Sequence, residues 1–232
     1  MTDGHSVWGE REAMTRTKPA EQRRAELLAA GQAQFLAKGV AATSLEDITR
    51  GAGVSKGLFY LYFRSKEDLV LALQDQFSTE FAGRILAAAA AEPDWGAKLD
   101  ACVQVSFDFY RDMHDLHEVL FRHAAGHREH AAGQHTGGQH AGGQQTAGDR
   151  EEAGHGRVVE AIQRILTEGT AAGALDVEDP ETTAILCYAS MHAFDPGFHG
   201  GGPGHPDGKA LLRAAQLLFR RVAGVVPGAG RR

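Results

Sequence analysis

The sequence has few of the features that crosslink a chain, anchor it in a membrane or mark an enzyme. It has only two cysteines among its 232 residues, which excludes a disulfide framework and a CxxC metal motif. No apolar run approaches the about 18 residues that a membrane-spanning helix needs, and the polar residues 1–16 lack the apolar core of a signal peptide. Walker A, Rossmann and HExxH motifs are absent. These absences predict a cytoplasmic protein that is not an enzyme, binds no cofactor and does not enter the membrane.

Charge is unevenly distributed along the chain. The formal net charge is −6. Up to Lys66 there are 10 Lys and Arg against 7 Asp and Glu, a net charge of +3, whereas the remainder has 14 against 23, a net charge of −9. A mildly basic N-terminal part on an acidic body fits a small nucleic-acid reader joined to a larger regulatory domain.

Apolar residues recur with helical rather than alternating spacing along most of the chain. This predicts an all-α fold with a disordered tail over 1–18, a three-helix domain with a helix-turn-helix over 19–65, and a larger helical domain over 66–226. Residues 126–154 are rich in Gly, Gln and His and have almost no large apolar residue, which predicts a flexible loop. Helices are expected at 19–38, 66–91, 95–110, 113–125, 156–173, 179–194 and 208–224.

The helix-turn-helix is predicted from its caps and its turn. Thr43 and Glu46 have the spacing of a capping box at the start of the second helix. Gly53 permits a positive φ in the tight turn that follows. Ser55 then caps the third helix, which we expect to end near Tyr62.

Outward-facing residues of the third helix are the candidate DNA contacts. A recognition helix presents its side chains to base edges in the major groove. Lys56 supplies a positive charge, and Tyr60 and Tyr62 supply hydroxyl groups and flat faces suited to phosphates and thymine methyls. Helix N-termini are additional sites for phosphate oxygens. The expected DNA contacts are Arg24, Thr43, Ser44, Arg50, Ser55, Lys56, Gly57, Leu58, Tyr60, Leu61, Tyr62 and Lys66.

The pattern Gly53-Val54-Ser55-Lys56-Gly57, with Tyr60, Tyr62-Phe63 and Ser65-Lys66-Glu67 after it, resembles the DNA-binding domain of the TetR (tetracycline-repressor-like) family. The resemblance covers about residues 20–70. It departs from the common pattern at Leu58, where a small hydroxylated residue is usual, and at Leu61, where a polar or aromatic residue is frequent. The resemblance implies a homodimer that binds double-stranded operator DNA, and a C-terminal domain for ligand binding and dimerisation.

The resemblance also implies that the last two helices pair with those of a second subunit in a four-helix bundle. Apolar residues at helical spacing in these helices are compatible with that role. The expected interface residues are Ile185, Ala189, Leu211, Leu212, Ala215, Leu218, Phe219 and Val222.

A pocket for an unidentified, largely apolar effector is expected among the helices of the larger domain. Effector binding would release the operator by shifting the population of conformations. For each candidate residue, a place in the ordinary apolar core is the alternative, and the one that apolar residues of a helical domain more often take. The candidates are Phe77, Phe81, Trp95, Phe107, Tyr110, Met113, Phe121, Met191 and Phe194.

Two alternatives to a ligand-responsive repressor remain open. Of the twelve histidines, His123, His127 and His130 would share one face of a continuous helix and could bind Zn, Ni or Cu. A metal-responsive regulator is therefore the first alternative. The competing interpretation is that these are simple loop histidines, and no dedicated metal site is predicted. The second is a transcriptional activator, because the sign of regulation depends on where the operator lies relative to the promoter.

Overall fold

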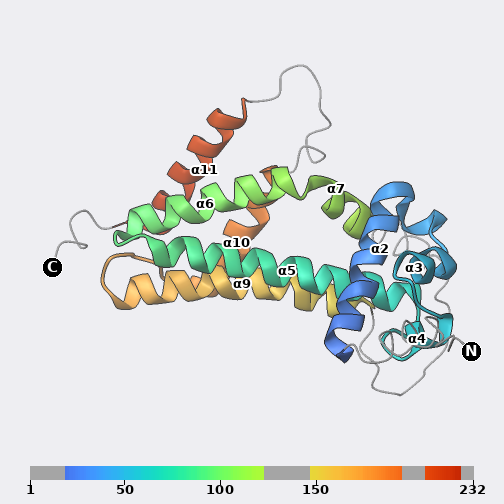
Figure 1. Cartoon of the computed structure of the whole chain (residues 1–232). Coiled ribbons are helices and arrows are strands. Elements are labelled where there is room, and N and C mark those ends of the chain that lie inside the picture. The colour runs from blue at the N-terminus through green and yellow to red at the C-terminus, as the bar shows by residue number, and fades with distance from the viewer. Residues whose placement is uncertain (1–18, 123–146, 195–206, 226–232) are drawn as a thin grey trace, which may run out of the picture. The chain divides into compact units, whose positions relative to one another are not determined.

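The structure is a computed structural model that describes residues 19–122, 147–194 and 207–225. Within these ranges the regular elements are all helices and no residue lies in a strand, so the all-α fold class is confirmed (Figure 1). The chain divides into two compact units, Met1–Ala72 and Leu73–Arg232. None of the helices in the described ranges combines the length and apolar content that a membrane crossing requires.

Unit 1 contains three helices and the beginning of a fourth: α2 (Ala20–Ala42), α3 (Leu45–Gly51), α4 (Lys56–Tyr60) and the first turns of α5 (Lys66–Ala91). The regular part of α2 ends after Lys38, because Gly39 adopts a φ of +79° that breaks the helical path. Glycine reaches this region without the steric cost that a Cβ imposes. The chain then turns into α3.

The core of unit 1 receives a fully buried large side chain from each helix. These are Phe35 from α2, Ile48 from α3, Phe59 from α4 and Leu69 from α5. Gly31 of α2 makes room for Leu69, since a Cβ at position 31 would lie 2.5 Å from Leu69 Cδ2. Burying a side chain of this size contributes about 1.5–3 kcal/mol. This small core therefore fixes the arrangement of α3 and α4.

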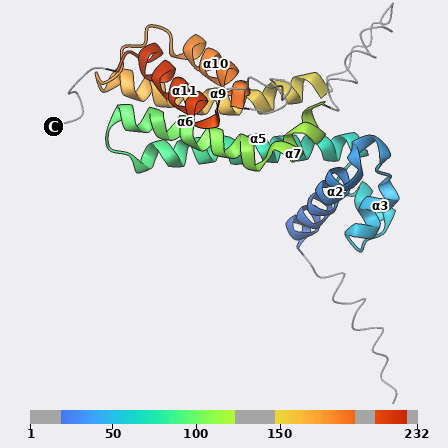
Figure 2. The ribbon, with the colours of Figure 1, turned by 90° about the horizontal axis from the view of Figure 1, so that it is seen from above.

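Unit 2 is built from longer helices in two layers. Figure 2 shows α5 and α6 in one layer and α9, α10 and α11 in the other. Helix α10 packs on α9, and α11 packs on α6. In chain order after α5, the elements are α6 (Trp95–Asp112), α7 (His114–His117), the π-helix η1 (Glu118–Arg122), α9 (Ala147–Ala171), α10 (Pro180–Met191), the 3₁₀-helix η2 (His192–Phe194) and α11 (Gly208–Val222).

Two sequence-based expectations for unit 2 were wrong in detail. The loop was expected to extend to residue 154, but α9 already begins at Ala147. Glu151, Glu152 and Ala153 have high helix propensity. They extend the helix toward its N-terminus, beyond the part that has the apolar pattern. The single helix expected over 113–125 is instead a short α7 followed by a π-helix over Glu118–Arg122, and 123–125 lie outside the described residues.

Aromatic side chains fill the layer between α5 and α6. The rings of Phe81 and Phe109 stack with centroids 4.5 Å apart, and Phe77 meets Phe109 edge-on at 4.8 Å. Gln74 is buried on α5, and its Nε2 donates a hydrogen bond of 2.9 Å to the Leu120 carbonyl of η1. This bond satisfies a backbone acceptor in the π-helix and joins it to α5.

Candidate functional site

The turn between α3 and α4 has the geometry that the sequence predicted. Gly53 adopts a φ of +64°, and Val54 N–H donates to the Thr49 carbonyl at 2.9 Å. The Ser55 hydroxyl accepts from Leu58 N–H at 3.2 Å, which caps α4. Helix α4 ends at Tyr60, two residues earlier than expected.

The segment Gly53–Gly57 also has the G-x-S-x-G spacing of a hydrolase nucleophile turn. In hydrolases this turn joins a strand to a helix and exposes the serine above a sheet. Here the same spacing joins two helices, and Ser55 serves as an N-cap. The segment is therefore part of the helix-turn-helix.

The expected capping box at the start of α3 was shifted by one residue. Ser44 is the N-cap, with its hydroxyl accepting from Asp47 N–H at 3.2 Å, and the Asp47 carboxylate accepts from Ser44 N–H at 2.9 Å. Thr43 is only 2% exposed, and its hydroxyl donates to the Gly39 carbonyl at 2.7 Å. The break of α2 at Gly39 leaves that carbonyl free to accept. The Thr43 side chain is thus held inside unit 1, away from its expected place among the DNA contacts.

Asp47 also binds α2. Lys38 Nζ lies 2.6 Å from Asp47 Oδ2. This contact with Lys38, followed by hydrogen bonds from Ser44, holds the pKa of the Asp47 carboxyl well below its ordinary value of 3.8. The ionised carboxylate fixes the N-terminus of α3 against the end of α2.

One face of α4 and the residues just after it is exposed. It consists of Lys56, Gly57, Tyr60, Leu61 and Arg64, here called the reading face. Gly57, Tyr60 and Leu61 have the i, i+3 and i+4 spacing that places side chains on one side of a helix, Lys56 directly precedes Gly57, and Arg64 lies in the bend after the helix. Tyr60 is 58% exposed and Leu61 is 77% exposed. The reading face thus combines two large exposed side chains, Tyr60 and Leu61, with two exposed cations, Lys56 and Arg64.

Two other predicted DNA contacts, one on α4 and one just after it, do not belong to the reading face. Leu58 and Tyr62 are half-buried, because they lie between the reading face and the buried side of the helix. That buried side is formed by Phe59 and Phe63, whose ring centroids lie 5.6 Å apart. Ser44 and Ser55, the two caps, are exposed.

The predicted cationic contacts have partners within unit 1. Lys56 Nζ lies 3.5 Å from Glu46 Oε2, and Arg50 Nη2 lies 3.2 Å from Glu46 Oε1. These exposed ion pairs are weak, so an anion of higher charge density can compete for Lys56 and Arg50. Arg24 instead lies over the Phe63 ring, 5.3 Å from its centroid.

Lys66 has a structural role in addition to its positive charge. Its Nζ donates to the Val40 carbonyl at 2.7 Å and to the Thr43 carbonyl at 2.9 Å. These bonds satisfy backbone acceptors between α2 and α3. Lys66 therefore holds the segment that leads into the helix-turn-helix.

In unit 2 the expected pocket residues pack largely against one another. Phe77, Phe81, Tyr110, Met191 and Phe194 are buried. Phe107 meets Phe194 edge-on at 5.6 Å, and Phe77 meets Phe121 at 5.5 Å. The remaining candidates are half-buried: Trp95, Phe107, Met113 and Phe121.

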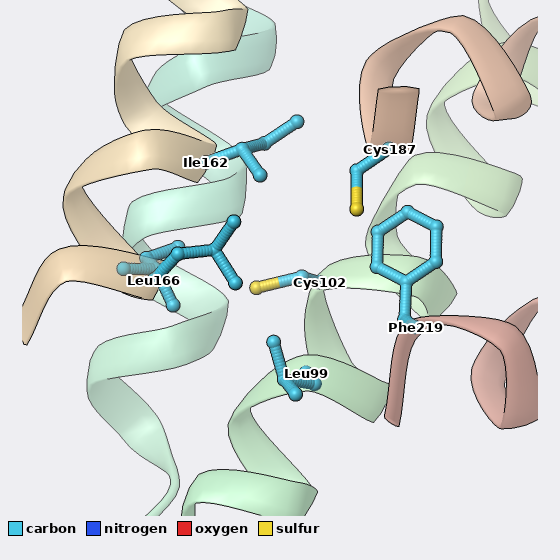
Figure 3. Close-up of a pocket in the computed structure, with 7 residues that line it drawn as sticks. Leu99, Cys102, Ile162, Leu166, Cys187 and Phe219 are labelled. Atoms are coloured by element: carbon cyan, nitrogen blue, oxygen red, sulfur yellow. The ribbon is translucent and has the colours of Figure 1, made fainter. Parts of the chain in front are cut away.

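A small apolar cavity lies elsewhere in unit 2, and none of the nine expected pocket residues lines it (Figure 3). It offers about 10 Å³ of free space, enough for about one water-sized sphere. Burial raises the pKa of Cys102 to about 12 and that of Cys187 to about 11, so both thiols stay protonated and weakly reactive. The residues that line this cavity are Leu99, Cys102, Ile162, Ile165, Leu166, Cys187 and Phe219.

Helices α10 and α11 carry every exposed large apolar side chain that the described part of unit 2 contains. We call this set the α10–α11 face. It consists of Ile185, Leu186, Leu217, Leu218 and Val222. Three of the five were among the residues expected at a dimer interface.

Of the other five expected interface residues, one is exposed, three are half-buried and one is buried. Ala189 is exposed, whereas Leu211, Leu212 and Ala215 are half-buried. Phe219 is only 3% exposed and lines the cavity inside its own unit. The apolar stripe of α11 was read as a single face, but its two sides pack differently: one faces α6 and the other is exposed.

Three exposed residues were not identified from the sequence. Leu186 and Leu217 belong to the α10–α11 face, and Arg64 belongs to the reading face. The spacing of Ile185, Leu186 and Ala189 places all three on one side of a helix, so Leu186 could have been found. Arg64 was missed because it lies beyond the expected end of the third helix.

The candidate metal ligands His123, His127 and His130 lie outside the described residues. Among the residues that the structure does describe, no group of three or more His, Cys, Asp or Glu side chains could hold a metal ion. The metal-responsive alternative therefore stays a prediction from sequence.

Comparisons with known proteins agree with the helix-turn-helix geometry. Residues 27–73 match the family described as "Bacterial regulatory proteins, tetR family". The chain is 30% identical to the transcriptional activator FasR of Mycolicibacterium smegmatis over 103 residues. The matched segment is 44% of this chain and 47% of FasR. The chain is also 34% identical to the transcriptional repressor KstR2 of Rhodococcus jostii over 86 residues. This matched segment is 37% of this chain and 42% of KstR2.

The chain thus spans less than half the length of these two relatives. A solved structure from Mesorhizobium loti, assigned to the TetR family, extends the similarity of fold to nearly the whole chain. It superposes with a TM-score of 0.66 at 18% identity, covering 90% of this chain and 100% of that one. The helix-turn-helix of unit 1 and the family match over it lead to one assignment: the N-terminal part of this chain is a DNA-binding domain of the kind found in the tetR family of bacterial regulatory proteins, and the whole chain shares the all-helical fold of a solved structure assigned to that family.

Proposed function

We propose that the protein is a homodimeric repressor that binds double-stranded operator DNA and releases it when a small effector binds. The observation that carries the proposal is the reading face of α4, where Lys56, Tyr60 and Arg64 are exposed within five residues of the exposed Leu61. Cations and hydroxyls bind phosphates, and flat or apolar side chains contact base edges. Few other partners offer both chemistries within the width of one helix.

The backbone of α4 supports close approach to DNA. A Cβ at Gly57 would meet only Ser55 Oγ, at 3.8 Å, so the surface around Gly57 is open. An α-helix fits the major groove of B-DNA, which is about 12 Å wide. We place the reading face in that groove, with Ser44, Ser55 and Arg50 toward the flanking phosphates.

The α10–α11 face supports a dimer. Five large apolar side chains on two helices exceed the scattered single residues that are normal on a protein surface. A second copy of this chain would cover them by pairing its own α10 and α11 with these. Two reading faces in one dimer could then contact half-sites one helical turn apart.

The effector is proposed to be small and largely apolar. The expected lining residues pack on one another, and the cavity at Cys102 has room for about one water. An effector would therefore bind conformations in which unit 2 is more open, and would shift the population toward them. Regulation in the opposite direction, as an activator, is the second candidate, since one relative is named an activator and another a repressor.

Selection from a random-sequence duplex library tests the DNA-binding part of this proposal. We expect the full-length protein to enrich an inverted repeat, and Tyr60→Ala to lower the affinity for it by at least tenfold. Leu36→Ala is the matched control, because Leu36 is also exposed in unit 1 but lies on α2. Failure to enrich any sequence would contradict the proposal.

A further inference from the structure

The most exposed large apolar side chain among the described residues is Leu61, at 77%. It directly follows α4 and retains helical φ and ψ values of −73° and −21°. Tyr62 N–H and Phe63 N–H both donate to the Phe59 carbonyl, at 2.9 and 3.0 Å, so the backbone stays helical through this position. The backbone hydrogen bonds therefore fix the position from which the Leu61 side chain projects.

The side chain of Leu61 limits what it can recognise. It has no hydrogen bond donor or acceptor, so it cannot bind a phosphate or the polar part of a base edge. Placed against polar base edges, it would displace water from them without replacing the lost hydrogen bonds, which is unfavourable. Each base pair shows a distinct pattern in the major groove, and the C5-methyl of thymine is the apolar group in that pattern.

We propose that Leu61 is a specificity-determining residue that selects a thymine in each operator half-site by contact with its C5-methyl group. This inference rests on the proposed function, because it requires the reading face to enter the major groove. Gly57 lies four residues earlier on the same face and presents no side chain, so position 57 does not shield Leu61 from an approaching groove. Tyr60 beside it supplies the hydroxyl that the leucine lacks.

A deoxyuridine scan of the selected operator tests the contact, since deoxyuridine lacks only the C5-methyl of thymidine. Each thymine is replaced in turn, in both half-sites, and the dissociation constant is measured by fluorescence anisotropy. For the wild-type protein we expect one thymine per half-site whose replacement weakens binding about fourfold, the effect of about one buried methyl group. Leu61→Ala should bind the thymine and uracil duplexes equally at that position.

Leu36→Ala is the matched control and should keep the wild-type response to uracil, because it removes an exposed leucine outside the reading face. Circular dichroism of each variant checks that α4 is still folded. If no uracil weakens wild-type binding, or if Leu61→Ala keeps the same sensitivity, the inference is wrong. Its failure is distinct from that of the proposed function: a flat scan on an operator that still requires Tyr60 overturns the role of Leu61 alone, whereas the absence of any selected operator overturns both.

Discussion

The reading face of unit 1 and the α10–α11 face of unit 2 are both exposed and both contain apolar side chains, but their compositions differ. Tyr60 and Leu61 are accompanied by Lys56 and Arg64 in helix α4 and the residues that follow it. The exposed large residues of α10 and α11 are purely aliphatic. A mixed face suits a ligand that presents charge and apolar groups together, as the DNA major groove does. An aliphatic face suits another aliphatic face, as in a homodimer interface.

The two faces also differ in what supports them. The reading face is carried by a helix of only five residues, which is far too short to be stable alone. It depends on the buried Phe59 and on the caps at Ser44 and Ser55. The α10–α11 face is carried by helices of 12 and 15 residues, and α11 is joined to α6 by Arg220 and Asp100. Perturbing one face should therefore leave the other intact.

The largest expected effect comes from removing the support of the reading face. Phe59→Ala should lower the stability of unit 1 by about 3–5 kcal/mol, because a fully buried aromatic side chain is lost and a cavity remains. Operator binding should be abolished while sedimentation still shows a dimer. Tyr60→Ala, at the exposed neighbouring position, serves as the control for stability. A variant that lost the dimer together with operator binding would show that the two faces are not independent.

A charge introduced on the α10–α11 face tests the second half of the comparison, the proposed dimer interface. Leu186→Glu would bury a carboxylate in the proposed dimer interface, and we expect the dimer dissociation constant to rise about hundredfold. Analytical ultracentrifugation over a range of concentrations measures this. Arg213→Glu introduces the same residue at an exposed position of α11 outside the aliphatic set and should leave the dimer unchanged. Equal sedimentation of Leu186→Glu and wild type would rule out this face as the interface.

The corrected cap of α3 predicts a smaller effect. Ser44→Ala should cost about 1 kcal/mol of unit 1 stability, whereas Ser44→Asn, which keeps a capping acceptor, should restore most of it. Denaturant unfolding followed by circular dichroism gives both values. If Ser44→Ala had no effect, the cap would lie elsewhere.

The cap also predicts a pH dependence. The pKa of Asp47 is lowered in the folded state, primarily by Lys38 and then by Ser44, so its ionised form favours folding. That contribution is fully present above the ordinary value of 3.8 and is lost as the pH falls below it. Asp47→Asn should therefore be less sensitive than wild type to acidification below about pH 4. Parallel acid-denaturation curves for the two proteins would contradict this assignment.

The smallest effect concerns the ion pair that holds α11. Arg220 Nε and Nη2 donate to the two carboxylate oxygens of Asp100 at 2.7 and 2.5 Å. Because the pair is partly exposed, a double-mutant cycle with Arg220→Ala and Asp100→Ala should give a coupling of only about 0.5–1 kcal/mol. The coupling should decrease with added salt. A coupling of zero would mean that this ion pair does not help to hold α11 on α6.

Most of the local structure could be predicted because it depends on residues close together in the sequence. Gly53 set the turn between α3 and α4, Ser55 capped α4, and α5 has the expected bounds, 66–91. What could not be predicted depended on distant partners. Whether Thr43 or Ser44 would cap α3 was decided by the free carbonyl of Gly39.

The direction of side chains on an amphipathic helix also required the tertiary structure. The spacing of Leu218 and Phe219 identified α11 as apolar, but only its packing on α6 shows that Phe219 points inward while Leu218 is exposed. Lys66 is a similar case. Its charge suggested a phosphate contact, and its two bonds to carbonyls more than twenty residues away were not visible in the pattern.

Targeted cleavage of DNA tests most directly whether the reading face contacts the operator. Arg64→Cys introduces an exposed thiol on that face, which can be labelled with a copper–phenanthroline reagent because Cys102 and Cys187 are buried and protonated. We predict cleavage at two symmetric positions within the selected operator. Thr167→Cys, exposed on α9 of unit 2, is the labelled control and should not give this pattern. Absence of localised cleavage by the Arg64→Cys conjugate, with operator binding retained, would contradict the account.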